Sequence, residues 1–154
     1  MKYSKNIIKQ KALLKKLIYK SADKIGLDYS EIPLKIMIQN KIKIGGFNSS
    51  YALSFSDVNT HEIKKQKIIL SLIGLKARTK SGFSNSYYSN RHERLSFLIG
   101  QKKLMRQFII FHELGHLHQK RLNPIAYNKS SQYDKEFFAD NFALENLKKD
   151  LENE

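Results

Sequence analysis

The stretch FHELGHLHQ at residues 111–119 places two histidines four residues apart, with a glutamate directly after the first. On a helix, His112 and His116 lie on one face with Cβ atoms about 5–6 Å apart, so both imidazoles can reach one metal ion. Glu113 sits about 100° round the helix from His112, close enough to touch a water beside the metal without binding the metal. Such a glutamate can take a proton from that water as it attacks a carbonyl. The spacing therefore predicts a hydrolytic zinc site.

A catalytic zinc site needs at least a third protein ligand, and the sequence excludes several candidates. The chain contains no cysteine, so a thiolate ligand is not available. The positions five and six residues after His116 hold Arg121 and Leu122 where a third histidine could stand. His118 lies about 200° round the helix from His116 and is expected to point away. We therefore expect a carboxylate as the third ligand of Zn²⁺.

Two acids on a later helix fit this requirement. Glu136 and Asp140 are four residues apart and share a face with apolar residues, where unpaired carboxylates would be costly to bury. We assign Glu136 as the third metal ligand and Asp140 as the acceptor of a ring N–H, most simply that of His112. Asp134 and Glu145 are fallback ligands. An exposed acidic stripe without a metal is the alternative interpretation.

The elements that must position these residues are two helices. The first is predicted at 101–122 and should end before Pro124, because the residue before a proline avoids helical geometry. The second, at 132–150, should bury an apolar stripe made of Phe138, Phe142, Ala143, Leu147 and Leu151. Gly115 within the first helix costs roughly 1 kcal/mol against alanine. We expect it to allow close approach of another backbone or of the substrate.

The N-terminal half has different periodicities. Residues 1–26 are predicted to form an amphipathic helix that stops at Gly26. Alternating apolar residues over 33–72 predict a small antiparallel or mixed sheet. The expected strands are 34–38, 41–44, 51–55 and 67–72. Residues 79–94 have no clear period and predict a long surface loop, which either contacts substrate or is a mobile connection.

Length and charge restrict the class of protein. The 154 residues suit one domain, and an apolar fraction of 41% argues against disorder. Lys and Arg number 28 against 14 Asp and Glu, which gives a net charge of +14. This charge favours direct contact with nucleic acid or with a protein bound to it, and a solvated basic surface is the alternative. Lysines interrupt the first apolar runs, so we expect a cytoplasmic protein without a membrane span.

The stretches FHELGHLH and EFFADNFALENL, at 111–118 and 136–147, resemble the ImmA/IrrE family of small zinc metallopeptidases. The similarity covers the C-terminal half with specific motifs and the N-terminal half only in the order of elements. It implies a zincin-like α+β fold with a gluzincin-like ligand pattern and cytoplasmic proteolysis. The ligands and the base that it implies are His112, His116, Glu136 and Glu113. Family members often cleave a helix-turn-helix repressor of a mobile element, such as a phage, or of a stress response.

We therefore expect a zinc-dependent endopeptidase whose substrate is a protein, with a DNA-bound repressor as one candidate. The sheet edge could hold an extended substrate segment by strand addition. A second hypothesis is a basic module that grips DNA or a partner protein with a structural or vestigial metal, and a third is a zinc hydrolase of another substrate class. Intact Glu113 argues against a purely structural site. Tyr127, Tyr133 and His118 are candidates for stabilising an oxyanion.

Overall fold

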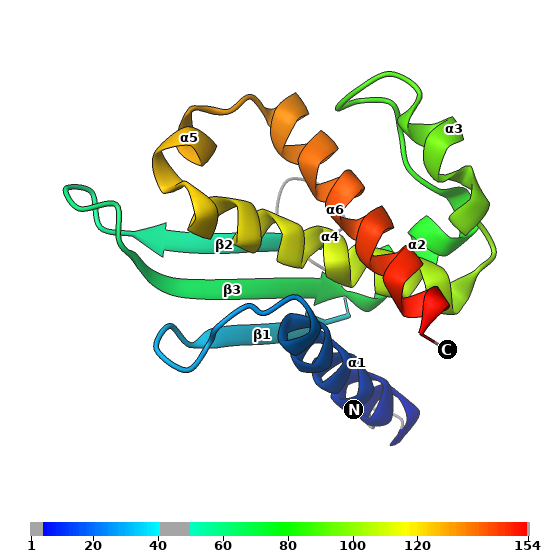
Figure 1. Cartoon of the computed structure of the whole chain (residues 1–154). Coiled ribbons are helices and arrows are strands. Elements are labelled where there is room, and N and C mark those ends of the chain that lie inside the picture. The colour runs from blue at the N-terminus through cyan, green and yellow to red at the C-terminus, as the bar shows by residue number, and fades with distance from the viewer. Residues whose placement is uncertain (1–4, 41–49, 154) are drawn as a thin grey trace.

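The computed structural model describes residues 5–40 and 50–153. This part of the chain is α+β, with six α-helices and a three-stranded mixed sheet (Figure 1). In chain order the elements are α1 (Lys5–Lys24), β1 (Leu34–Gln39), β2 (Tyr51–Ser56), β3 (Ile63–Ser71), α2 (Leu72–Ser81), α3 (Arg91–Leu95), the short 3₁₀ helix η1 (Ser96–Leu98), α4 (Lys102–Leu122), α5 (Pro124–Lys129) and α6 (Gln132–Glu152).

The strand order is β1-β3-β2, with β1 parallel and β2 antiparallel to β3. The sheet is therefore mixed, and β2 lies at one edge of it. The strand predicted at 67–72 is wrong at both ends, because β3 begins at Ile63 and Leu72 already belongs to α2. The change to helix follows from Ser71, whose side chain accepts a hydrogen bond from the Gly74 N–H and caps α2. The strand predicted at 41–44 lies outside the described residues.

The N-terminal helix is confirmed over its described part. α1 buries Leu14, Ile18 and Ala22, and the chain leaves it through Gly26 at φ 72°, the left-handed conformation that a glycine stop requires. Within residues 5–40 and 50–153, no helix combines the length and apolar character that crossing a membrane requires.

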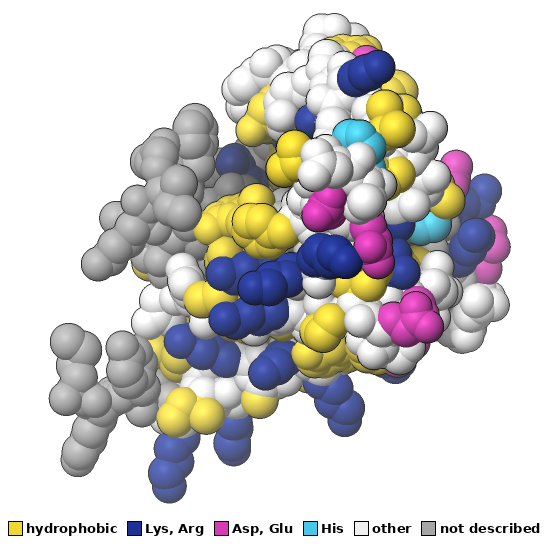
Figure 2. All heavy atoms as spheres, turned by 90° about the vertical axis from the view of Figure 1, so that its left-hand side faces the viewer, with side chains coloured by type: hydrophobic (Ala, Val, Ile, Leu, Met, Phe, Trp, Pro, Cys, Tyr) yellow, Lys and Arg dark blue, Asp and Glu magenta, His cyan; other side chains and the backbone are white. Residues whose placement is uncertain are grey.

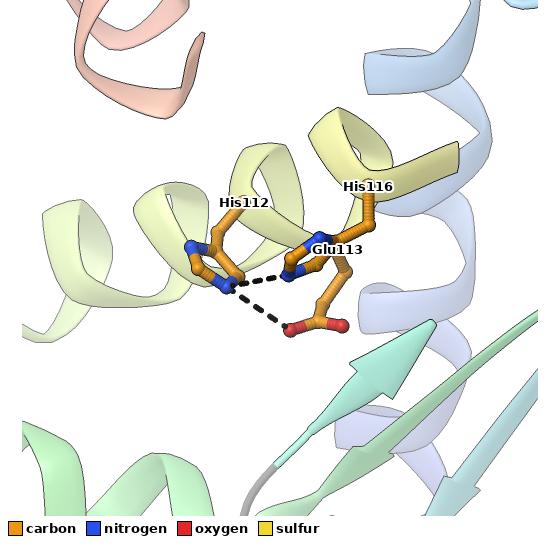
Figure 3. Close-up of side chains that lie close together, drawn as sticks. All are labelled: His112, Glu113 and His116. Carbon is orange, nitrogen blue, oxygen red and sulfur yellow. Dashed lines mark hydrogen bonds and ion pairs between the residues drawn. The ribbon is translucent and has the colours of Figure 1, made fainter. Parts of the chain in front are cut away.

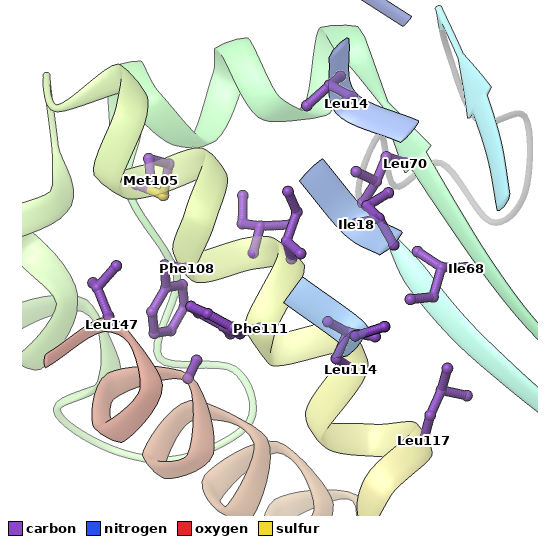
Figure 4. Close-up of a cluster of buried hydrophobic side chains, with 14 of the residues drawn as sticks. Leu14, Ile18, Ile68, Leu70, Met105, Phe108, Phe111, Leu114, Leu117 and Leu147 are labelled. Atoms are coloured by element: carbon purple, nitrogen blue, oxygen red, sulfur yellow. The ribbon is translucent and has the colours of Figure 1, made fainter. Parts of the chain in front are cut away.

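The helix α4 forms the centre of the core. Its residues 108–117 are all buried, because α6 crosses it on the side away from the sheet while α1 and β3 pack on the other side (Figures 1 and 4). The predicted helix at 101–122 is confirmed, and it ends at Leu122 before Asn123-Pro124. The chain then starts the short α5, which the sequence patterns do not predict.

The helix α6 confirms the element predicted at 132–150, although its apolar stripe differs from the predicted one. Ala139, Ala143 and Leu147 are buried together with Glu136 and Asp140. By contrast, Phe138 and Phe142 are only half-buried and Leu151 is 52% exposed. The stripe is narrower than expected because Glu136 and Asp140 occupy part of the buried face of α6.

The prediction of a surface loop at 79–94 is wrong in two respects. α2 continues to Ser81 and α3 begins at Arg91, so only the residues between them lack regular structure. Phe83, Tyr88 and Arg91 are buried. The segment folds back over α6 because its aromatic and cationic side chains find partners there, as the site shows.

Candidate metal centre

The helix α4 brings three ionisable side chains together in its buried middle. His112, Glu113 and His116 are buried, and one potential ligand atom from each lies within 4.8 Å of the others. The two rings point toward one another from the same side of α4, with the Glu113 carboxylate beside them (Figure 3). Their Nε2 atoms are 3.1 Å apart. This group could hold a metal ion.

A fourth side chain reaches the same point from α6. The Glu136 carboxylate places Oε2 3.1 Å from His112 Nε2 and Oε1 3.2 Å from His116 Nε2. Glu113 stands further off, with Oε1 3.8 Å from His112 Nε2. Both acids belong to the cluster, but Glu136 lies nearer to the two ring nitrogens.

The spacing of these atoms suits a small divalent cation. Ligand atoms of a tetrahedral site with bonds of about 2.0–2.1 Å are about 3.3 Å apart, close to the separations between His112, His116 and Glu136. His116 Nδ1 is buried without a hydrogen-bond partner among the described residues, so no described polar group orients that ring from behind. A cation at the convergence point would be within reach of both rings and the carboxylate.

Asp140 fixes the orientation of His112. Its Oδ1 is 2.8 Å from His112 Nδ1, so the ring N–H donates to the carboxylate and Nε2 faces the cluster, as the sequence predicts. Burial lowers the pKa of His112, but the hydrogen bonds to Asp140 and Glu136 outweigh burial and raise this pKa to about 10. Without a metal the ring therefore keeps a proton, which a bound cation must displace.

Arg91 and Tyr88 complete the site, and sequence reasoning did not assign them. Arg91 donates from Nε to Asp140 Oδ2 at 2.9 Å and from Nη2 to Asp140 Oδ1 at 3.1 Å, and Nη2 also lies 3.4 Å from Glu136 Oε2. The Tyr88 hydroxyl donates to Asp140 Oδ2 at 2.5 Å. Burial raises the pKa of Asp140, but the bonds from His112 and Arg91 outweigh it and keep this pKa below its usual range. The one signal in the sequence that could have indicated Arg91 is that two buried acids need a buried cation as partner.

Glu113 has the environment of a proton acceptor. Burial raises its pKa, and the charges of His112 and His116 only partly oppose this. The Ser50 hydroxyl donates to Oε1 at 3.3 Å, whereas the buried Oε2 has no hydrogen-bond partner among the described residues. Oε1 is thus hydrogen-bonded, while Oε2 is buried without a described partner.

A cleft of about 490 Å³ opens onto this cluster. The start of β2 forms one wall with Tyr51 and Ala52, and Tyr127 from α5 contributes beside α6. Of the three predicted oxyanion candidates, only Tyr127 lines the cleft. Tyr133 stacks on Phe137 and His118 packs against Phe142, both away from the cleft lining.

Packing decides the predictions made for Gly115, Asp134 and Glu145. A Cβ on Gly115 would lie 3.0 Å from a ring carbon of Phe142, so the close approach comes from a side chain of α6 and not from a backbone or a substrate. The fallback ligands Asp134 and Glu145 are exposed on α6. Neither faces the buried cluster.

Comparison of the chain with family models, with curated proteins and with solved structures finds no match in any of the three. The fold and the site define an α+β protein with a buried His112, Glu113 and His116 group that could hold a metal ion. Function is therefore inferred from the chemistry of this group and its cleft.

Proposed function

We propose that the chain is a zinc-dependent endopeptidase with a zincin-like fold, as its resemblance to the ImmA/IrrE family implies. The observation that supports this most is the position of the two glutamates. Glu136 approaches both ring nitrogens at 3.1 and 3.2 Å, while Glu113 stays 3.8 Å from the nearer one. One acid has the position of a ligand and the other has that of a base.

In this proposal His112, His116 and Glu136 hold zinc through Nε2, Nε2 and the carboxylate. Bound zinc would supply Lewis acidity, which polarises the scissile carbonyl and activates water. Asp140 keeps the His112 N–H on Nδ1, and Arg91 holds Asp140 and Glu136 in place. His112 and Glu136 are thus oriented before the metal and substrate arrive.

Glu113 transfers the proton of the attacking water in this mechanism. Its carboxylate takes a proton from the attacking water and passes it to the leaving amine, a transfer worth about 10²–10⁴-fold in rate. The raised pKa of Glu113 suits the second half of this transfer, because the carboxyl must hold the proton until the amine departs. Tyr127 lines the same cleft and is the candidate for donating to the carbonyl oxygen.

The proposed substrate is an extended segment of a protein. The cleft runs along the start of the edge strand β2, where a peptide can add as a further strand. The net charge of +14 would draw the enzyme to a substrate bound to DNA, such as a helix-turn-helix repressor.

The second candidate function is a basic module that binds DNA or a partner protein. Figure 2 supports it, since Lys and Arg side chains gather beside hydrophobic ones on the face seen from the left of Figure 1. A module of this kind has no use for Glu113, whose buried and half-satisfied carboxylate is costly. The endopeptidase accounts for both the charge and Glu113, so we favour it.

Metal analysis combined with two substitutions tests the proposal. Purified protein should contain one equivalent of zinc, and Glu113→Gln should keep that zinc while hydrolysis of candidate repressors falls about 10²–10⁴-fold. Glu145→Gln makes the same change on an exposed face of α6 and should alter neither property. A protein without zinc affinity, or a Glu113→Gln variant that cleaves normally, rules the proposal out.

A further inference from the structure

Arg78 near the end of α2 reaches the cleft without a role in holding the metal. Its guanidinium lies 5.6 Å from the centroid of the Phe83 ring, against which Arg91 also packs at 4.8 Å. Arg91 in turn lies 3.4 Å from Glu136. These contacts connect Arg78 to the proposed ligand Glu136 through Phe83 and Arg91, and Arg78 lines the same cleft.

The charge of Arg78 has no anionic partner within the described residues. Its one hydrogen bond there runs from Nη1 to the Gly82 carbonyl at 3.4 Å, although a guanidinium has five N–H donors. Of the residues that the structure does not describe, 1–4 and 41–49 contain no Asp or Glu, and Glu154 is the one acid. Burial and the neighbouring Arg91 both lower the pKa of Arg78, as expected for a cation withdrawn from water without a counterion.

The other charged groups around the cleft do not compensate the charge of Arg78. Asp140 offsets Arg91, and Glu113 with Glu136 would offset a bound divalent cation. Lys135 adds a further positive charge at the cleft, with Nζ 4.6 Å from the Tyr127 ring centroid. The lining therefore has an excess of positive charge once the metal centre is loaded.

We propose that Arg78 forms a subsite for a carboxylate of the substrate. The guanidinium fork matches a carboxylate in two parallel hydrogen bonds, and a partly dry cleft strengthens them. This inference rests on the proposed peptidase function and adds a substrate class to it: peptides with an anionic group next to the scissile bond. The carboxylate can be an Asp or Glu side chain of an internal segment or the C-terminus of the substrate.

Peptidyl hydroxamates separate these sources, because the hydroxamate chelates zinc and anchors each probe at the metal. One probe has a glutamyl side chain and an amidated C-terminus, a second has glutaminyl and the amide, and a third has glutaminyl and a free C-terminal carboxylate. Binding to the zinc-loaded full chain is measured by calorimetry. A carboxylate at Arg78 should bind about 10- to 100-fold more tightly than its amide counterpart.

Variants of α2 assign the preference to Arg78. Arg78→Gln should bring the affinity ratio to about one, while Arg78→Lys keeps the charge and should keep part of the preference. Lys80→Gln removes the same charge from an exposed position of the same helix and should leave the ratio unchanged. Thermal melting of each variant confirms that the fold is retained.

The outcomes distinguish this inference from the function on which it rests. Tighter binding of the glutamyl probe supports an acidic side chain, and tighter binding of the free-carboxylate probe supports a substrate C-terminus. Equal binding of all three probes, or a preference that Arg78→Gln leaves intact, overturns the carboxylate subsite and leaves the zinc site standing. No binding of any hydroxamate to metal-loaded protein overturns the peptidase function itself.

Discussion

The two walls of the cleft are built in different ways. On the α6 wall, Glu136 and Asp140 are buried and connected by hydrogen bonds or ion pairs to His112, Arg91 and Tyr88. On the β2 wall, residues 50–52 are only half-buried and lie at the start of an edge strand. One wall is made of paired charges and the other of residues at the start of an edge strand.

This difference separates holding a metal from holding a substrate. Buried charges keep one geometry only when every member of the network is paired, and Asp140 is paired with three donors. A strand edge accepts many sequences, because main-chain groups are the same in every peptide. We therefore expect substitutions on the α6 wall to affect stability and metal binding, and substitutions on the β2 wall to affect substrate use.

The largest effect is expected at Asp140. Asp140→Asn leaves the buried Arg91 guanidinium with Glu136, 3.4 Å from Nη2, as its remaining described counter-charge, which should cost about 3–5 kcal/mol in the free energy of unfolding. It also removes the negative charge that holds the His112 N–H, so metal affinity should fall about 10–100-fold. Urea unfolding and competition with a chelator measure the two quantities.

The matched control is on the same helix. Asp150 pairs with Lys24 at 2.9 Å, but both side chains are partly exposed, so Asp150→Asn should cost less than about 1 kcal/mol. Metal affinity should not change. Equal costs for the two substitutions would show that the network around Asp140 does not act as a unit.

Per pH unit, a smaller effect is expected in the metal-free protein. The pKa of His112 rises from 6.5 to about 10 in the fold, against the penalty of burial, because Asp140 and Glu136 favour the charged ring. A raised pKa stabilises the fold fully below about pH 6.5, and this contribution is lost as pH increases toward about 10. The slope is at most about 1.4 kcal/mol per pH unit.

Urea unfolding between pH 6 and 10 measures this loss, with and without zinc. Zinc displaces the proton from His112, so the loaded protein should lack this part of the slope. His112→Asn should remove it from the metal-free protein, and His61→Asn, a substitution in the β2–β3 connection, should not. An identical slope in loaded and metal-free protein would contradict a shared site for proton and metal.

The α6 wall was largely predictable from the sequence. The pair His112 and His116 has the spacing of one helix face, and the cost of burying Glu136 and Asp140 without partners indicates that they face the histidines. These arguments need only helical periodicity and the cost of burial. The hydrogen bond between Asp140 and His112 confirms them.

The partners of these acids could not be predicted in the same way. Tyr88 and Arg91 are 52 and 49 residues before Asp140, in a segment without periodicity, so only the folded chain brings them together. Their polar neighbours suggest an exposed loop, and tertiary pairing overrides that local signal. The β2 wall was predicted as a strand, but its place at the cleft depends on sheet order, which alternation does not encode.

The β2 wall gives the smallest expected effect. Lys120 Nζ donates to the Ser54 carbonyl at 2.7 Å, so this carbonyl faces away from β3, and Ala52, two residues earlier, has the same orientation. Ala52→Pro removes one free-edge N–H and should spare the bonds to β3. If substrate adds as a strand there, kcat/KM should fall about tenfold with metal affinity unchanged. Ala52→Ser keeps the N–H and is the control. If both variants cleave alike, the substrate peptide does not pair with this edge, and the β2 wall does not bind substrate through its backbone.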